Sequence, residues 1–95
     1  MKSSTALLKA WKLFRGGRGW IKDDWRRFND KGRASYCAIG ALWEIDIEDT
    51  DPIEKHLAAA GVADLVSFND APTTTYGDVS RAFRRAAALA RAAGD

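Results

Sequence analysis

The final segment of the chain, residues 75–93, constrains the fold most, because it carries the full pattern of one long amphipathic helix. Thr75 and Asp78 have the spacing of a capping box, in which each side chain accepts a hydrogen bond from the other residue's backbone amide. Apolar residues then recur at the helical period, at Val79, Phe83, Ala86 and Ala90. We therefore predict a helix from Thr75 to about Ala93 whose alanine-rich face packs against a core.

The other side of this predicted helix is basic. At about 100° per residue, the arginines gather opposite the apolar stripe, at Arg81, Arg84, Arg85 and Arg91. Together with Arg26 and Arg27 they offer a surface that can contact phosphate groups. Helix surfaces are often charged, however, and the chain lacks helix-turn-helix spacing, a zinc finger and a Gly-rich phosphate loop. A nucleic-acid-associated role is therefore an alternative hypothesis.

Two further helices are predicted from residues that favour helix starts or helix stops. The first runs from about Ser4 to Arg15 and is followed by glycines that favour a helix stop, at Gly16, Gly17 and Gly19. Its apolar side carries Leu7, Trp11 and Phe14.

Another helix begins at Asp51, where an N-cap acceptor precedes a proline at the first helical position. Glu54 has the position that completes a capping box, and the helix should end near Ala60 before Gly61. The next segment, residues 62–68, is too short for its apolar pattern to separate a helical turn from a strand. We favour a helical turn.

The middle of the chain contains an almost wholly apolar segment, residues 36–43. Ser35 is the expected N-cap of a helix over this segment, which we predict to be the centre of the core. Gly40 lies inside it and costs about 1 kcal/mol relative to alanine. Its presence predicts that another backbone, or a large ring such as that of Trp11 or Trp25, packs closely against it.

The segment between the first helix and this core is harder to assign. Aromatic residues at Trp20, Trp25 and Phe28 fit a helix from about Ile21, although part of the segment can be extended. Residues 29–32, with the sequence Asn-Asp-Lys-Gly, predict a turn, because asparagine and glycine tolerate a left-handed backbone. A hairpin around this turn is the alternative to the helix.

Composition fits one small ordered domain. The chain has 95 residues, of which 46% are hydrophobic and 29% charged, with only two prolines. We predict a mainly α protein, with residues 1–95 forming a compact single-domain bundle of about four to five helices and a short hairpin or irregular segment. No apolar run approaches the roughly 20 residues that cross a bilayer, and the start lacks the features of a signal peptide. We therefore expect a cytoplasmic protein without a membrane partner.

Cys37 is the sharpest catalytic candidate, because a thiol near a helix N-terminus can have a lowered pKa. A cysteine nucleophile also needs a base and an orienting group, for which His56 and either Asn69 or Asp70 are the candidates. Nothing in their spacing brings these residues together, and the neighbours of Cys37 favour a small buried side chain. A cysteine-dependent enzyme centred on Cys37 is a second alternative hypothesis.

The sequence offers no complete metal or cofactor site. One cysteine and one histidine cannot form an internal disulfide or a structural zinc site. Residues 44–51 are rich in carboxylates but lack the glycine and closing glutamate of a calcium loop. We interpret this segment as a solvated connection, and we expect no metal and no cofactor.

The charges are sorted along the chain. Residues 1–36 hold ten basic and three acidic residues, residues 37–78 hold one and nine, and residues 79–95 hold four and one. Blocks of opposite sign can attract each other within the fold or steer a partner towards it. They can also be matched between two copies, so a homodimer stays open.

Short motifs give the chain a resemblance to a known family. It has a Gly-Trp pair at residues 19–20, a Cys-x-x-Gly-Ala segment that begins at Cys37, and an aromatic-Asn-Asp turn at residues 68–70 that leads through Thr75 into the last helix. Over residues 19–90 it resembles a family of small uncharacterised proteins of actinobacteria and their phages. The resemblance implies a fold in which the Asn-Asp turn lies close to the Cys-x-x-Gly-Ala helix, and it implies no activity. Its motif residues, which we interpret as structural, are Cys37, Gly40, Asn69, Asp70 and Thr75.

The leading hypothesis is a small non-enzymatic interaction module that binds a host or viral protein. It rests on the sorted charges, on the incomplete catalytic set, and on the four tryptophans, of which one or two are expected to be exposed anchors. Trp20, which follows a glycine-rich stretch, is the candidate for partial exposure. The predicted partner-binding residues are Trp20, Arg26, Arg27, Arg81, Arg84, Arg85 and Arg91.

Overall fold

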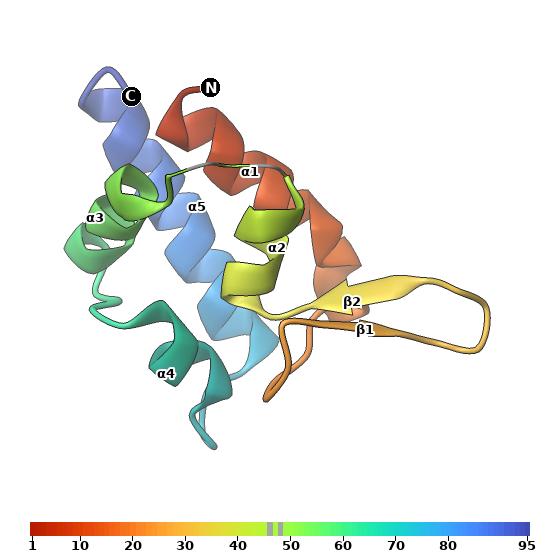
Figure 1. Ribbon diagram of the computed structural model, residues 1–95. Coiled ribbons are helices and arrows are strands. Elements are labelled where there is room, and N and C mark those ends of the chain that lie inside the picture. Colours follow the sequence, from red (N-terminus) through yellow and green to blue (C-terminus); the bar gives the residue numbers. More distant parts are fainter. Residues whose placement is uncertain (46, 48) are drawn as a thin grey trace.

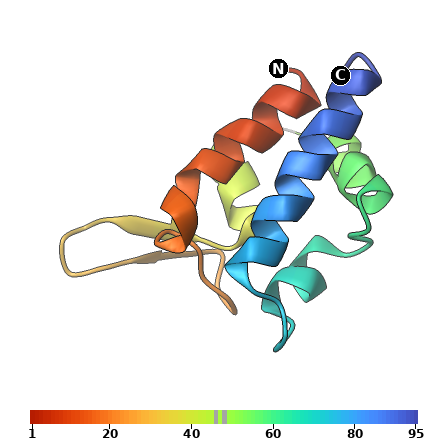
Figure 2. The same ribbon diagram turned by 180° about the vertical axis from the view of Figure 1, so that it is seen from behind.

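The longest helix of the protein, α5 (Tyr76–Ala92), packs side by side with α1 (Ser3–Leu13), and the remaining elements cover one side of this pair (Figures 1 and 2). The structure is a computed structural model that describes residues 1–45, 47 and 49–95. Within these residues the elements are, in chain order, α1, a 3₁₀ turn η1 (Arg15–Gly17), β1 (Arg26–Phe28), β2 (Ala34–Tyr36), α2 (Ala38–Glu44), α3 (Asp51–Ala59), α4 (Leu65–Asp70) and α5. The protein is therefore mainly α with one short hairpin, as predicted.

The start and the buried face of α5 are those predicted from the sequence. The Thr75 amide donates to Asp78 Oδ2 at 2.9 Å and the Asp78 amide donates to Thr75 Oγ1 at 3.3 Å, which completes the capping box. The predicted stripe is buried, and its members are Val79, Phe83, Ala86 and Ala90. Burial of this stripe removes apolar surface from water and fixes α5 in the core.

The pairing of α1 with α5 is antiparallel and brings the two chain ends together. The Ser4 amide donates to the Asp95 carbonyl oxygen at 2.9 Å. At the other end of α1, the ring of Phe14 meets that of Phe83 edge-on with centroids 5.4 Å apart. The apolar pattern of α1 predicted this helix to within two residues at each end.

The apolar segment in the middle of the chain forms α2, which lies in the core as predicted, but its N-cap differs. Cys37 is the N-cap, and its Sγ accepts a hydrogen bond from the Gly40 amide at 3.4 Å. The predicted cap, Ser35, lies in β2 instead. The prediction was wrong because the backbone up to Tyr36 is extended by pairing with β1, so the helix begins only after Cys37.

Gly40 confirms the close approach that was predicted for it. A Cβ atom at this position would overlap the backbone carbonyl oxygen of Trp25. The same carbonyl oxygen accepts a hydrogen bond from the Cys37 amide at 3.2 Å. The segment before β1 thus lies directly on the first turn of α2, and only glycine leaves room for it.

The predicted helix from about Ile21 is absent, and the hairpin alternative is confirmed. β1 and β2 pair antiparallel with Arg26 opposite Tyr36 and Phe28 opposite Ala34. The Ile21 amide donates to the Tyr36 carbonyl oxygen at 3.1 Å, so it pairs with the neighbouring extended chain and not within a helix. Asp23 has a φ of 64°, which is incompatible with a right-handed helix.

The turn that joins the two strands lies where the sequence predicted it. Asn29 Oδ1 accepts hydrogen bonds from the amides of Lys31 and Arg33, each at 2.9 Å, and Gly32 has a φ of 74°. The hairpin projects from the helical body (Figure 1).

The helix predicted from Asp51 is α3, but its start lacks the predicted capping box. Thr50 is the N-cap without a side-chain hydrogen bond to the backbone, and its hydroxyl donates to Glu54 Oε2 at 3.0 Å. Since Asp51 is already the first helical residue, its carboxylate cannot cap the helix from the N-cap position.

The segment after α3 forms α4 (Leu65–Asp70), which confirms the predicted helical turn and extends it. The carboxylate of Asp64 caps this helix by accepting from the Ser67 amide at 3.1 Å. Of the acidic connection at residues 44–51, Asp46 and Glu48 lie outside the described residues, and Ile45 and Ile47 pack against the core. Across the part of the chain that is described, no helix combines the length and apolarity needed to cross a membrane.

Candidate functional site

Four large apolar side chains lie exposed on the hairpin and on the helices next to it. They come from three parts of the chain: Trp25 and Phe28 from the segment of β1, Trp43 from the last turn of α2, and Val66 from α4. Their exposed fractions are 41%, 57%, 52% and 50% in that order. We call these four residues the Trp25–Trp43 surface. Large apolar groups gathered on the surface of a small protein are typical of an interaction site.

The two tryptophans of this surface contact each other. Their ring centroids are 5.9 Å apart and the rings are inclined by 64°. Trp25 is held in place through its backbone, because its carbonyl oxygen lies against Gly40 and the start of α2. Trp43 is presented by the last turn of α2, whose residues 38–42 are all buried. The pair is therefore fixed by core elements although both rings are exposed.

Arg26 lies over the outer rings of the surface. Its guanidinium carbon is 4.4 Å from the Trp25 ring centroid and 5.0 Å from that of Phe28, distances at which a cation is attracted to an aromatic face. Its Nη1 is also 3.4 Å from Glu44 Oε2. Arg26 thereby contacts both aromatic rings and Glu44.

A cavity of about 280 Å³ opens beside the tryptophan pair. Its lining residues are Asp23, Asp24, Trp25, Cys37, Ile39, Trp43, Val66 and Asp70. The lining thus combines aromatic and aliphatic walls with three carboxylates and contains no lysine or arginine. Such a cavity fits a side chain with an apolar stem and a cationic head.

The carboxylates at this cavity differ in how they are used. Asp70 Oδ1 accepts from the Asp23 amide and from Asn69 Nδ2, both at 2.9 Å. Asp24 Oδ1 accepts from the Trp25 amide at 2.9 Å, and its Oδ2 is 3.9 Å from Arg27 Nη2. These bonds hold the loop with Asp23 and Asp24 in place beside the cavity.

Asn69 is the polar centre that joins this loop to α2. It is 1% exposed, and its Oδ1 accepts from Trp20 Nε1 at 2.6 Å and from the Ala38 amide at 2.9 Å. Its Nδ2 donates to the Ile21 carbonyl oxygen at 3.0 Å and to Asp70. The Asn-Asp pair therefore lies at the N-terminus of the Cys-x-x-Gly-Ala helix, the arrangement that the motif resemblance implied.

Trp20, the candidate for partial exposure, is half-buried, as predicted, but its indole N–H is used inside the fold. Its indole N–H donates to Asn69, and its ring lies 6.2 Å from that of Tyr76. The exposed tryptophans are Trp25 and Trp43 instead. The sequence pattern of α2 held no signal for the exposure of Trp43, because residues 38–42 are all apolar or glycine and all are buried. The exposure of Trp25 and Phe28 depends on the hairpin, which the residue pattern predicted only as the alternative to a helix.

The three catalytic candidates are not brought together. Cys37 and Asp70 line the same cavity, whereas the Nε2 of His56 lies 2.9 Å from Asp95 Oδ2, at the end where the termini meet. Burial raises the pKa of the Cys37 thiol and outweighs the hydrogen bond from the Gly40 amide, which lowers it. The position of Cys37 at the helix N-terminus therefore does not lower the pKa of its thiol, contrary to the expectation from the sequence. Within the described residues, no three Cys, His, Asp or Glu side chains form a group that could hold a metal ion.

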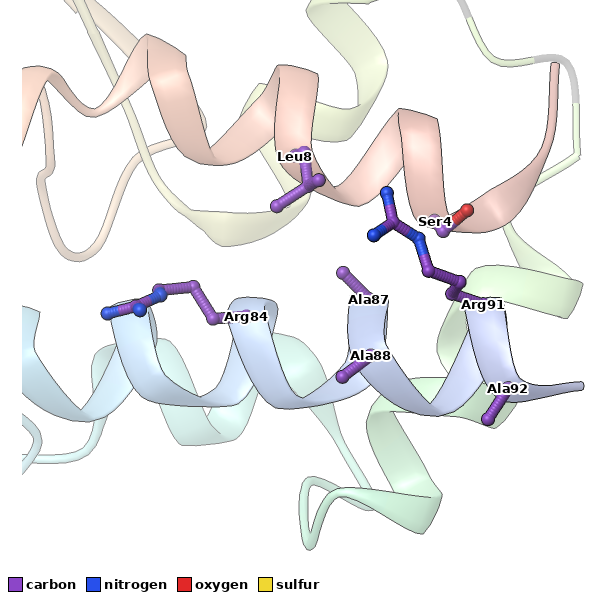
Figure 3. Close-up of a pocket in the computed structure, with 7 residues that line it drawn as sticks. All are labelled: Ser4, Leu8, Arg84, Ala87, Ala88, Arg91 and Ala92. Atoms are coloured by element: carbon purple, nitrogen blue, oxygen red, sulfur yellow. The ribbon is translucent and has the colours of Figure 1, made fainter.

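The predicted arginines fall into separate groups. Arg84 and Arg91 line a groove between α1 and α5 (Figure 3), whereas Arg81 and Arg85 line a cavity next to α3 and α4. Arg81 is also paired with Asp78 at 2.6 Å. Arg26 and Arg27 lie on the hairpin, where they contact Glu44 and Asp24.

The fold and the surface define a small, mainly helical domain with a projecting hairpin and an exposed tryptophan pair. A model of a family of unknown function (DUF6197) matches residues 4–89, and the chain belongs to that family. The match includes almost all of the range over which the motif resemblance was noted and extends it through α1. Comparison with curated proteins and with solved structures gives no match.

Proposed function

We propose that this protein is an interaction module that binds a segment of a partner protein through the Trp25–Trp43 surface. The observation that carries the proposal is the exposure of two tryptophans that are in contact and fixed by buried elements. Tryptophan is enriched among the residues that dominate binding energy, and rings that are already ordered lose little entropy on binding.

The chemistry of the cavity indicates which partner segment fits. Its walls are apolar, and its carboxylates come from Asp23, Asp24 and Asp70. An arginine or lysine of the partner can lay its methylene groups on Trp43 and Val66 while its charge approaches the carboxylates. The preferred partner is therefore a basic segment that inserts one cationic side chain beside the tryptophan pair. That the protein is encoded by a phage and that its partner is a host or viral protein stay predictions.

The test compares partner capture by the wild-type protein and by Trp43→Ala, with Leu89→Ala as the control. Leu89 is an exposed apolar residue of α5 and belongs neither to the Trp25–Trp43 surface nor to its cavity. A protein captured by the wild type and by Leu89→Ala, lost with Trp43→Ala, and bound more weakly by Asp23→Asn supports the proposal. Capture that is unaffected by Trp43→Ala, or the capture of no specific protein, would contradict it.

The two alternative functions have less support from the geometry. Nucleic-acid binding would use the α5 arginines, which lie in two separate pairs, with the charge of Arg81 countered by Asp78. Binding to duplex DNA that weakens steeply with salt would favour that alternative. A cysteine-dependent reaction would use Cys37, whose thiol is buried and has a raised pKa.

A further inference from the structure

The α1–α5 pair has a side that no described element covers. Figure 2 shows the two helices side by side on the near side, with α2 and α3 behind them. A groove of about 380 Å³ runs between the helices on their open side. Its lining residues are Ser4, Leu8, Arg84, Ala87, Ala88, Arg91 and Ala92 (Figure 3).

The shape of this groove suits a third helix. Ala87, Ala88 and Ala92 carry only methyl groups, so a partner backbone can approach α5 closely there, as in other tight helix contacts. Leu8 supplies the larger apolar contact from α1. Two antiparallel helices with an open groove between them offer the position at which a third helix packs in a three-helix bundle.

The positive charge at the groove favours a binding partner with negative charge. Arg84 and Arg91 border it, and the ring of Trp11 lies 5.9 Å from the guanidinium carbon of Arg84. Among the described residues, no carboxylate lies within 4.0 Å of the guanidinium nitrogens of Arg84 or Arg91, in contrast to the pairing of Arg81 with Asp78. The groove therefore presents two arginines without a partner to whatever enters it.

The spacing of these arginines matches a helix better than a single anion. They are seven residues apart on α5, which corresponds to about 10 Å along the helix axis. We propose that the α1–α5 groove binds an acidic amphipathic helix of a partner protein, with two carboxylates one heptad apart pairing with Arg84 and Arg91 and leucine-type residues between them on the alanines. This inference is independent of the Trp25–Trp43 surface.

The test uses a synthetic helical peptide of about 18 residues, long enough to form a helix on contact. It carries two glutamates one heptad apart with leucines between them, and a matched peptide carries lysines in place of the glutamates. Backbone amide NMR signals report binding at Ala87, Ala88 and Ala92. We expect the acidic peptide to shift these signals at millimolar concentration or below and the basic peptide to leave them unchanged.

Charge-reversal variants decide whether the arginines are responsible. Combined Arg84→Glu and Arg91→Glu should weaken the acidic peptide about tenfold, as expected for two exposed ion pairs turned into repulsion. Arg85→Glu is the control, since Arg85 is exposed on the same helix but lines the other cavity. Trp25→Ala should have no effect. The proposal is overturned by any one of three results: the acidic peptide causes no shifts, both peptides bind equally, or Arg85→Glu weakens binding as much as the double variant. It is also overturned if an anionic amphiphile such as decanoate, added in a separate titration, shifts the signals and the acidic peptide does not.

Discussion

Asn69→Ala should destabilise the protein more than any other removal of a single polar side chain. The substitution deletes the acceptor of the Trp20 indole N–H and the Ala38 amide, and the donor to the Ile21 carbonyl oxygen. Each buried polar group left without a partner costs about 1–3 kcal/mol. Three such groups give about 3–9 kcal/mol. Because Trp20 is only half-buried and water can reach its indole N–H, we expect a loss in the lower part of this range, about 3–5 kcal/mol, which is a large part of the 5–15 kcal/mol that typical domains have.

The assay is urea unfolding followed by tryptophan fluorescence, with the free energy of unfolding obtained by linear extrapolation. Asn69→Asp separates the two halves of the amide, because it keeps the acceptor for Trp20 and Ala38 but places a carboxylate oxygen against the Ile21 carbonyl oxygen and Asp70. It should also destabilise the protein. Asn29→Ala is the control, since Asn29 is exposed in the hairpin turn. A loss below about 1 kcal/mol for Asn69→Ala would refute the reasoning that Asn69 is the polar centre of the fold.

Three further outcomes follow from the same structure. Gly40→Ala should cost about 2–3 kcal/mol in urea unfolding although alanine favours helices, because its Cβ must displace the Trp25 carbonyl oxygen; unchanged stability would contradict the close approach. Cys37 should react with a thiol reagent only when the protein unfolds, because its thiol is buried and has a raised pKa; rapid labelling of the folded protein would show otherwise. The pKa of Asp95 is lowered to about 2 from 3.8, chiefly by hydrogen bonds from Ser3, so its contribution to stability is full above pH 3.8 and is lost as the pH falls towards 2. The difference in urea midpoint between the wild type and Asp95→Asn should shrink over that range, and a constant difference would argue against the lowered pKa.

Much of the helical framework could be predicted because its signals are local. A capping box needs only the residues of one turn, and the buried stripe of α5 needs only the helical period, so Thr75, Asp78 and Phe83 were placed correctly. The start of α3 was placed to within one residue, but its cap was not, since Thr50 and Asp51 both fit that position in the sequence.

The candidate surface was predictable only in part: the four tryptophans indicated one or two exposed anchors, but not which ones. The helical period could not place Trp43 at the surface, because residues 38–42 of α2 are all apolar or glycine and all are buried, including Ile39 one turn before Trp43. Trp25 and Phe28 could not be placed either, because the choice between a helix and a hairpin at residues 20–28 was made by distant groups. The Tyr36 carbonyl oxygen accepts from the Ile21 amide, and Asp70 accepts from the Asp23 amide.

The sequence by itself thus determined a mainly helical domain, its long capped C-terminal helix, and a glycine in α2 that required a close neighbour. The tertiary structure alone decided that this neighbour is the backbone of Trp25, that Trp20 is used within the fold, and that Trp25 and Trp43 lie together at the surface. The physical reason is the distance along the chain over which each kind of interaction acts. Capping and periodicity act within a few residues, whereas the hydrogen bonds of Asn69 join residues 31 and 49 positions apart in the chain, and their partners are defined only once the chain has folded.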